Sequence, residues 1–147
     1  IFETMSELEE AKIGVAAAAR TGLPVIACMV YDSGKNKDRT MMGVTPEQAA
    51  RGLEEAGADV VGANCGQGPE GYIEICRRLR SATSLPLWIK PNAGLPKLVD
   101  GKTVYQTTPA EFAAGVPAIL DAGASFIGGC CGTTPDFVRA IAAACRP

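Results

Sequence analysis

The sequence contains no histidine among its 147 residues. Histidine is the commonest general base near neutral pH and the commonest protein ligand of zinc, so both roles fall to other residues. Any metal ion bound here must therefore be held by sulfur or oxygen atoms.

Two classes of partner are disfavoured by further absences. No apolar run reaches the roughly 18 to 20 residues of a membrane helix, and no basic segment followed by an apolar one forms a signal peptide. The 14 Lys and Arg residues are scattered among 16 Asp and Glu residues, for a net charge of -2, which leaves no basic footprint for nucleic acid or an anionic membrane. We expect a cytoplasmic protein. Because it starts at Ile1, inside an expected strand, we also expect it to be part of a longer one.

The six cysteines are numerous enough to form a disulfide framework. However, 47% of the residues are hydrophobic, and a chain with that much apolar content builds a core that needs no covalent cross-links. We therefore expect reduced thiols that serve metal binding or chemistry.

A unit of helix, glycine and strand repeats along the chain. Three segments (19–26, 55–61 and 121–127) read as a helix end, a glycine that caps it, and a short apolar strand. Helix starts are marked by capping-box patterns at Ser6, Thr45 and Thr108, and by proline at 69 and 135. The sequence thus predicts helices over 6–21, 46–56, 69–82, 109–122 and 135–145, and strands over 1–5, 24–30, 59–64, 86–90 and 125–129.

The predicted strands are almost wholly apolar, which is typical of parallel strands covered by helices. Repeated βα units with right-handed crossovers leave two architectures: a small open doubly wound sheet, or five of the eight units of a (β/α)8 barrel. Both architectures place ligands at the carboxyl ends of the strands.

Three of the six cysteines fall at those strand ends. Cys65 follows the third predicted strand, and Cys130 and Cys131 follow the last. The other strand ends carry Glu3, Tyr31-Asp32 and Lys90-Pro91-Asn92. We expect Cys28, Cys76 and Cys145, which lie within elements or at a helix end, to be small buried side chains.

The adjacent pair Cys130-Cys131 raises a geometric question, because neighbouring side chains in a regular strand point to opposite faces. The flanking glycines permit a bend that brings both sulfurs to one point. Plain burial and a vicinal disulfide are the alternatives to a metal site. Three thiolates can hold Zn²⁺ at about 2.3 Å and leave the fourth tetrahedral position open.

An open site with three thiolates favours one kind of chemistry. Zn²⁺ with three thiolates carries a net charge of -1, so it is a poor Lewis acid for hydrolysis. A substrate thiol in the fourth position would lose its proton and remain a nucleophilic thiolate. The pattern therefore favours alkyl transfer to sulfur.

Three motifs identify a family that the chain resembles. GANC at 62–65, PNAGLP at 91–96 and GGCCGTTP at 128–135 are similar to the homocysteine S-methyltransferase family, most closely to the homocysteine-binding module of cobalamin-dependent methionine synthases. The resemblance implies a (β/α)8 barrel, of which residues 1–147 form the C-terminal portion, about strands four to eight.

The resemblance also implies roles for individual residues. Cys65, Cys130 and Cys131 match the zinc ligands that activate the homocysteine thiol. Glu3 matches an acidic residue that helps to hold the substrate ammonium group. The amide oxygen of Asn92 would fill the fourth metal position before substrate arrives, unless Asn92 only supports its own turn.

The methyl donor implied by the resemblance is methylcobalamin. Without a histidine the chain has no cobalt-ligating histidine motif, so another domain or protein must supply the corrinoid. The alternatives are S-adenosylmethionine or another methylated donor, a non-catalytic zinc scaffold, and a Schiff-base enzyme built on Lys90. Because strands one to three are absent, we expect residues 1–147 alone to be inactive or poorly stable, or to associate with the N-terminal half of a barrel or with a second copy.

Overall fold

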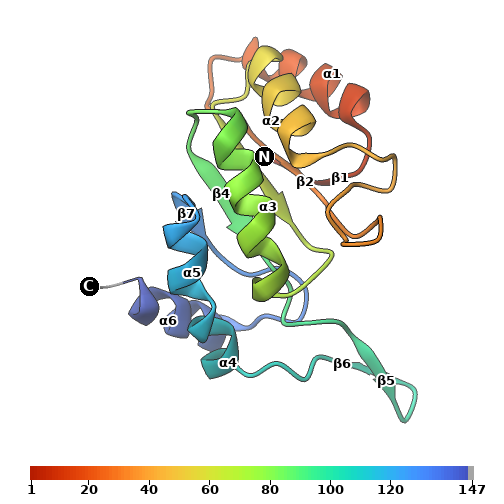
Figure 1. The fold of residues 1–147 in the computed structure, drawn as a ribbon, viewed down its shortest axis with the longest axis vertical. Coiled ribbons are helices and arrows are strands. Elements are labelled where there is room, and N and C mark those ends of the chain that lie inside the picture. The colour runs from red at the N-terminus through yellow and green to blue at the C-terminus, as the bar shows by residue number, and fades with distance from the viewer. Residues whose placement is uncertain (146–147) are drawn as a thin grey trace.

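Five parallel strands form the sheet of this protein, whose computed structural model describes residues 1–145 (Figure 1). The sheet contains β1 (Phe2–Met5), β2 (Ile26–Met29), β3 (Val60–Asn64), β4 (Leu87–Lys90) and β7 (Phe126–Ile127). Each strand pairs in parallel with the next one along the chain. An open doubly wound sheet reverses its strand order at a switch point, whereas a barrel adds its strands in sequence. The observed order is that of the barrel.

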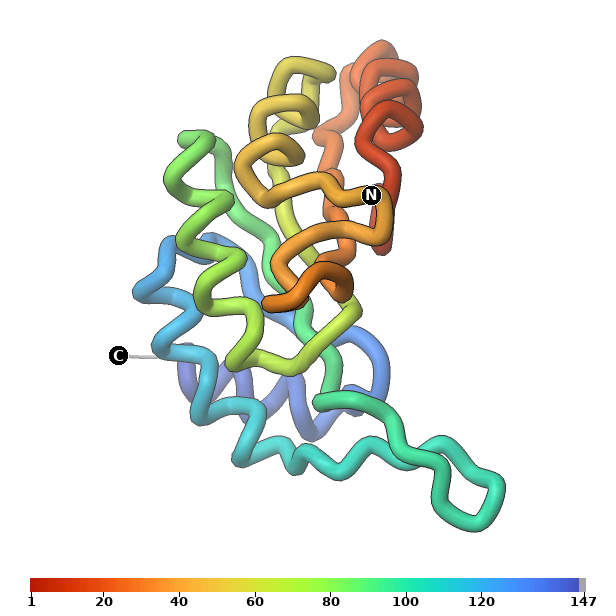
Figure 2. Tube along the Cα trace, turned by 45° about the vertical axis from the view of Figure 1, so that its right-hand side comes forward, coloured from red at the N-terminus to blue at the C-terminus, as the bar shows by residue number. Residues whose placement is uncertain are grey.

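The helices are α1 (Leu8–Ala19), α2 (Pro46–Glu55), α3 (Pro69–Ala82), α4 (Pro109–Ala114), α5 (Val116–Asp121) and α6 (Pro135–Ala144). Helices α1, α2, α3 and α5 cover one face of the sheet, and each packs against the next (Figure 2). Alternate strand residues such as Met29, Val61 and Ile89 are buried against them. A smaller core joins α4, α5 and α6, where the rings of Phe112 and Phe137 meet edge to face at 5.6 Å.

The other face of the sheet carries the intervening side chains. Trp88 and Phe126 lie there with ring centroids 5.3 Å apart, and 46% of Phe126 is exposed. This face corresponds to the interior of a barrel, which the side chains of all eight strands fill together.

Several predicted element ends are correct, and others are wrong for local reasons. Thr45 and Thr108 both form complete capping boxes. Ser6 does not cap α1: Glu7 is the N-cap, and its carboxylate accepts a hydrogen bond from the Glu10 N–H at 2.7 Å. The predicted helix 109–122 is divided at Gly115, because Pro117 has no N–H to continue the hydrogen-bond ladder.

A hairpin that was not predicted follows β4. Strands β5 (Lys97–Val99) and β6 (Lys102–Val104) pair in antiparallel fashion around Asp100-Gly101, and this arm projects from the body in both views (Figures 1 and 2). Both turn residues have positive φ, 49° and 74°, as a two-residue type I′ turn requires.

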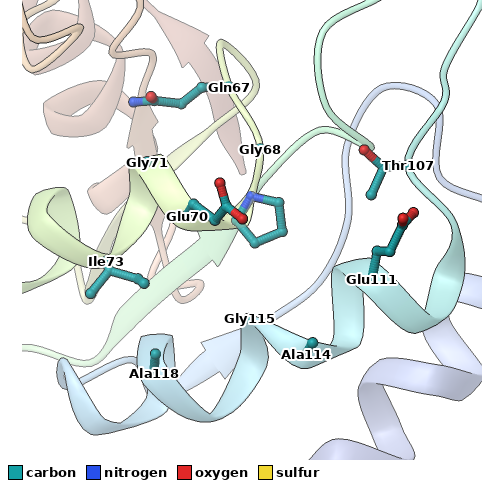
Figure 3. A pocket seen from close by; sticks show the side chains of 11 residues that line it. Gln67, Gly68, Glu70, Gly71, Ile73, Thr107, Glu111, Ala114, Gly115 and Ala118 are labelled. Carbon is teal, nitrogen blue, oxygen red and sulfur yellow. The ribbon is translucent and has the colours of Figure 1, made fainter.

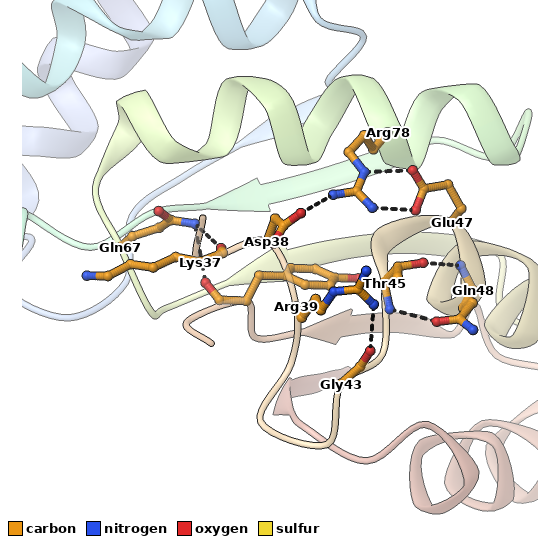
Figure 4. A network of polar contacts seen from close by, with 10 residues as sticks. Lys37, Asp38, Arg39, Gly43, Thr45, Glu47, Gln48, Gln67 and Arg78 are labelled. Carbon is orange, nitrogen blue, oxygen red and sulfur yellow. Dashed lines mark hydrogen bonds and ion pairs between the residues drawn. The ribbon is translucent and has the colours of Figure 1, made fainter. Parts of the chain in front are cut away.

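The segment 32–43 is attached to α2 and α3 (Figure 4). Arg78 of α3 binds Asp38 at 2.7 Å and Glu47 of α2 at 2.6 Å. Hydrogen bonds from Arg78 lower the pKa of Glu47 to about 2. The Gln67 side chain donates to the Lys37 carbonyl at 3.1 Å. These contacts make the segment part of the folded body.

A search of the described residues for a helix that is both long and apolar enough to cross a membrane finds none.

Candidate metal centre

Three cysteines meet at the carboxyl edge of the sheet. Cys65 follows β3, and Cys130 and Cys131 follow β7, with β4 between these two strands. Their Sγ atoms all lie within 4.8 Å of one another, and those of Cys65 and Cys131 are 3.8 Å apart. Ligands about 2.3 Å from a tetrahedral zinc ion are about 3.8 Å apart, so the three sulfurs fit such an ion.

All six cysteines are free thiols, so neither a disulfide framework nor a vicinal Cys130–Cys131 bond is formed. Cys28 and Cys76 are buried, as predicted. The expectation for Cys145 is wrong: it is exposed, at the C-cap position that ends α6.

The bend at Cys130-Cys131 depends on contacts with the segment after β4. The Cys130 N–H donates to the Pro91 carbonyl at 2.8 Å, and the Ala93 N–H donates to the Cys131 carbonyl at 2.9 Å. Gly132 then takes a φ of 80°, a conformation that side chains disfavour. A Cβ atom on Gly132 would lie 2.2 Å from Cγ of Tyr105, so the Tyr105 ring rests directly on this glycine.

Cys65 itself occupies the left-handed region, with a φ of 66°, which is uncommon for a residue other than glycine. Two donors hold its carbonyl: the Gln67 N–H at 2.8 Å and the hydroxyl of the fully buried Tyr72 at 2.5 Å. Strained backbone of this kind persists where surrounding contacts over-determine it, commonly at functional sites. The contacts fix the direction in which the Cys65 thiol points.

Asn92 lies between the two cysteine segments and is only 5% exposed. Its Oδ1 accepts a hydrogen bond from the Cys131 N–H at 3.0 Å, and its Nδ2 donates to Cys65 Sγ at 3.7 Å. Asn92 therefore does more than support its own turn. Its predicted role as an oxygen ligand would use the second lone pair of Oδ1.

The pKa of Cys131 is raised to about 11, first by burial and then by the neighbouring Cys65 and Cys130. Three thiolates this close together repel one another, so the thiol form is favoured in the absence of a cation. A bound divalent cation reverses this preference, since a coordinating thiol is deprotonated.

Glu3 of β1 and Lys90 of β4 also meet at this edge, with Oε1 and Nζ 2.6 Å apart. About 37% of the Glu3 side chain is exposed. The Lys90 ammonium is thus engaged by a carboxylate, which gives no support to the Schiff-base hypothesis.

A pocket lies elsewhere, on the helical side of the sheet. It has a volume of about 520 Å³ between α3 and the α4–α5 pair, with Glu70, Thr107 and Glu111 at its wall (Figure 3). The cysteine site is instead an open edge of the sheet, and the wall of the pocket includes none of its three thiols.

Three residues next to the cysteines were missed from the sequence: Asn64, Tyr72 and Tyr105. Each acts through a contact with a residue of another segment, so no local pattern marks it. Asn64 alone carried a signal, because it directly precedes Cys65 at the end of a strand.

A parallel α/β chain with barrel strand order and an open group of three thiols at its carboxyl edge defines a class: barrel proteins whose thiols could hold a metal ion. The family model described as homocysteine S-methyltransferase matches residues 1–145. The chain belongs to the homocysteine S-methyltransferase family.

Similar sequences include two methionine synthases. That of Mycobacterium leprae is 33% identical over 148 residues, and that of Mycobacterium tuberculosis is 34% identical over 151 residues. Each alignment covers 98% of this chain and 12% of the relative, so the chain spans about an eighth of the length of these relatives.

Solved structures with the same fold include the homocysteine methyltransferase MmuM from Escherichia coli. Its apo form is 23% identical with a TM-score of 0.74, and the match covers 97% of this chain and 48% of that one. Its metallated form gives a TM-score of 0.73 at 24% identity. The fold is therefore that of these (β/α)8 barrels, of which this chain covers about half.

Proposed function

We propose that this chain supplies the homocysteine-activating edge of a zinc-dependent homocysteine S-methyltransferase. One observation carries the proposal: three cysteine sulfurs from two separate strand ends stand within 4.8 Å of one another, close enough to share one tetrahedral zinc ion.

Each residue of the site has a proposed task. Cys65, Cys130 and Cys131 would hold the zinc ion. When bound, zinc would supply a fourth position in which a substrate thiol stays deprotonated at neutral pH. Glu3 would bind the substrate ammonium group, and Asn92 would keep the two cysteine segments in register. In the net reaction the homocysteine sulfur gains the methyl group and loses its proton.

We propose a methylcorrinoid as the methyl donor. The chain is similar to methionine synthases but spans only 12% of their length. The remainder of a protein of that length would be large enough to contain a domain that binds the methyl donor. The absence of histidine from this chain means that a histidine-ligated corrinoid would be bound by another domain or protein. S-adenosylmethionine or another methylated donor is the alternative. Activity with methylcobalamin but not with S-adenosylmethionine would separate the two.

Metal analysis tests the zinc site. Under reducing conditions we expect one zinc ion per chain in the wild type, much less in Cys130→Ser, and no loss in Cys145→Ser, whose thiol is exposed at the end of α6. X-ray absorption at the zinc edge should then show one additional sulfur ligand on the zinc ion when homocysteine is added. A wild type without stoichiometric zinc would overturn the proposal, and zinc that homocysteine does not reach would indicate a non-catalytic scaffold.

A further inference from the structure

Asn64 is a buried polar residue that the mechanism above does not use. It ends β3, and only 1% of it is exposed. Its Oδ1 accepts a hydrogen bond from the Thr4 N–H at 2.7 Å. Its Nδ2 donates to Thr4 Oγ1 at 2.8 Å and to Cys130 Sγ at 3.6 Å. Because a backbone N–H can only donate, the Thr4 contact fixes which end of the amide faces the sulfur.

These contacts join strands that do not pair with each other. Thr4 belongs to β1, and β2 lies between β1 and β3. The β1–β2 register shifts between Phe2 and Met5, and Thr4 takes a φ of 61° within this irregularity. The Asn64 amide thus binds both the backbone N–H and the side-chain hydroxyl of Thr4. Glu3, the proposed ammonium-binding residue, is next to Thr4 in the chain.

The third contact of Asn64 reaches the proposed metal site. An N–H donor beside a metal-bound thiolate stabilises the negative charge on sulfur without adding a ligand. Asn92 places its own Nδ2 near Cys65 Sγ in the same way. Two of the three sulfurs thus have a neutral amide donor, which suits a site whose metal and three thiolates carry a net charge of -1.

We propose that Asn64 is a positioning residue that couples the substrate-binding end of β1 to the metal ligand Cys130. The proposal rests on the proposed function. A leucine of similar size would remove both the acceptor of the Thr4 N–H and the donor to Cys130. One side chain therefore sets both the orientation of Glu3-Thr4 and the charge on one sulfur.

The test uses the full-length protein that carries this sequence and separates the two contacts. Asn64→Asp keeps an oxygen for the Thr4 N–H but replaces the donor facing Cys130 with a carboxylate oxygen. Thr4→Val removes only the hydroxyl and leaves the amide–sulfur contact in place. Asn36→Asp makes the same chemical change as Asn64→Asp at an exposed loop position and serves as the matched control.

Zinc affinity is measured by competition with a chromophoric chelator, and the sulfur-to-cobalt charge-transfer band is recorded after Co²⁺ substitution. We expect Asn64→Asp to weaken zinc binding by about 10- to 100-fold and to move the cobalt band, with Asn36→Asp like the wild type. Thr4→Val should leave zinc affinity unchanged and raise KM for homocysteine roughly 2- to 10-fold, the effect of one lost hydrogen bond.

The outcomes are distinguishable. Wild-type zinc affinity and an unmoved cobalt band in Asn64→Asp would overturn the inference and leave the zinc site intact. If Asn64→Asp does not fold, Asn64→Ser replaces it, because its shorter hydroxyl stops well before Cys130 Sγ; wild-type affinity in that variant would equally overturn the inference. Failure of the wild type to bind zinc would instead overturn the proposed function.

Discussion

The Sγ atoms of Cys65 and Cys131 lie 3.8 Å apart although 66 positions separate the two residues in the chain. The strand between them, β4, makes this approach possible. Its continuation binds both cysteine segments, through Cys130 N–H to Pro91 O and through the two ends of the Asn92 amide. These backbone and amide hydrogen bonds hold the three sulfurs near one point, so little of the metal-binding energy is spent on ordering the site.

Metal affinity should rise with pH. The pKa of Cys131 is raised to about 11, so below that pH its thiol holds a proton that metal binding must release. Each proton released makes the apparent Kd fall about tenfold per pH unit, so between about pH 6 and pH 8 we expect a decrease of at least about 100-fold. Chelator competition at several pH values, corrected for protonation of the chelator, measures this. An affinity independent of pH would contradict thiolate ligation.

Gly132→Ala should disturb the site more than its backbone strain alone predicts. Gly132 has a φ of 80°, and an added Cβ would lie 2.2 Å from the Tyr105 ring. Gly22→Ala is the control, since Gly22 has a φ of 74° with no atom within 4 Å of the added Cβ. We expect Gly22→Ala to lower the free energy of unfolding by about 1 kcal/mol, and Gly132→Ala by more, with weaker zinc binding as well. If urea titrations show that the two variants lose the same free energy of unfolding, the Tyr105 ring moves aside without an energetic cost.

Local features of this fold are readable from the sequence, and contacts between distant segments are not. The capping boxes at Thr45 and Thr108 were predicted correctly because all their atoms lie within four residues. The hairpin at 97–104 had a signal that was missed, Asp100-Gly101 between short alternating segments. Its strands have only three residues each, all of them exposed, so the alternating pattern is too short to stand out in the sequence.

The residues of the candidate site show the same difference between local features and contacts of distant segments. The three cysteines were found because parallel strands place their carboxyl ends at one edge, which is a rule of topology. Tyr72 and Asn64 were missed because their partners, the Cys65 carbonyl and Thr4, are identified only by the folded backbone. Residues that hold the three thiols in place are therefore harder to predict than the thiols themselves.

Glu3→Gln should weaken homocysteine binding and leave the metal in place. The substitution keeps the size of the side chain and removes the charge proposed to bind the ammonium group. Loss of a charge-assisted hydrogen bond corresponds to roughly a 10- to 100-fold rise in KM for homocysteine. Asp32→Asn, at the end of the neighbouring strand, is the matched control. An unchanged KM in Glu3→Gln would assign ammonium binding to another residue.

Arg78→Met should release the 32–43 segment from α2 and α3. Arg78 is the shared partner of Asp38 and Glu47, so we expect the free energy of unfolding to fall by about 1 kcal/mol at neutral pH. The folded-state pKa of Glu47 is lowered from 4.5 to about 2. Its stabilising effect is thus complete above about pH 4.5 and is lost as the pH falls toward 2, where wild type and variant should converge. Arg77→Met, whose partner Glu74 is exposed, should change little at any pH.

Residues 1–147 produced alone should associate through the inner face of the sheet. Phe126 is 46% exposed there beside Trp88, and exposed aromatic surface of this kind favours contact with another chain. We expect the apparent mass in sedimentation experiments to rise with concentration, and Phe126→Ser to reduce that rise. Val138→Ser serves as the control, because Val138 is 58% exposed on α6, away from this face. A monodisperse monomer that unfolds cooperatively on heating would show that the inner face of the sheet is stable without contact to another chain.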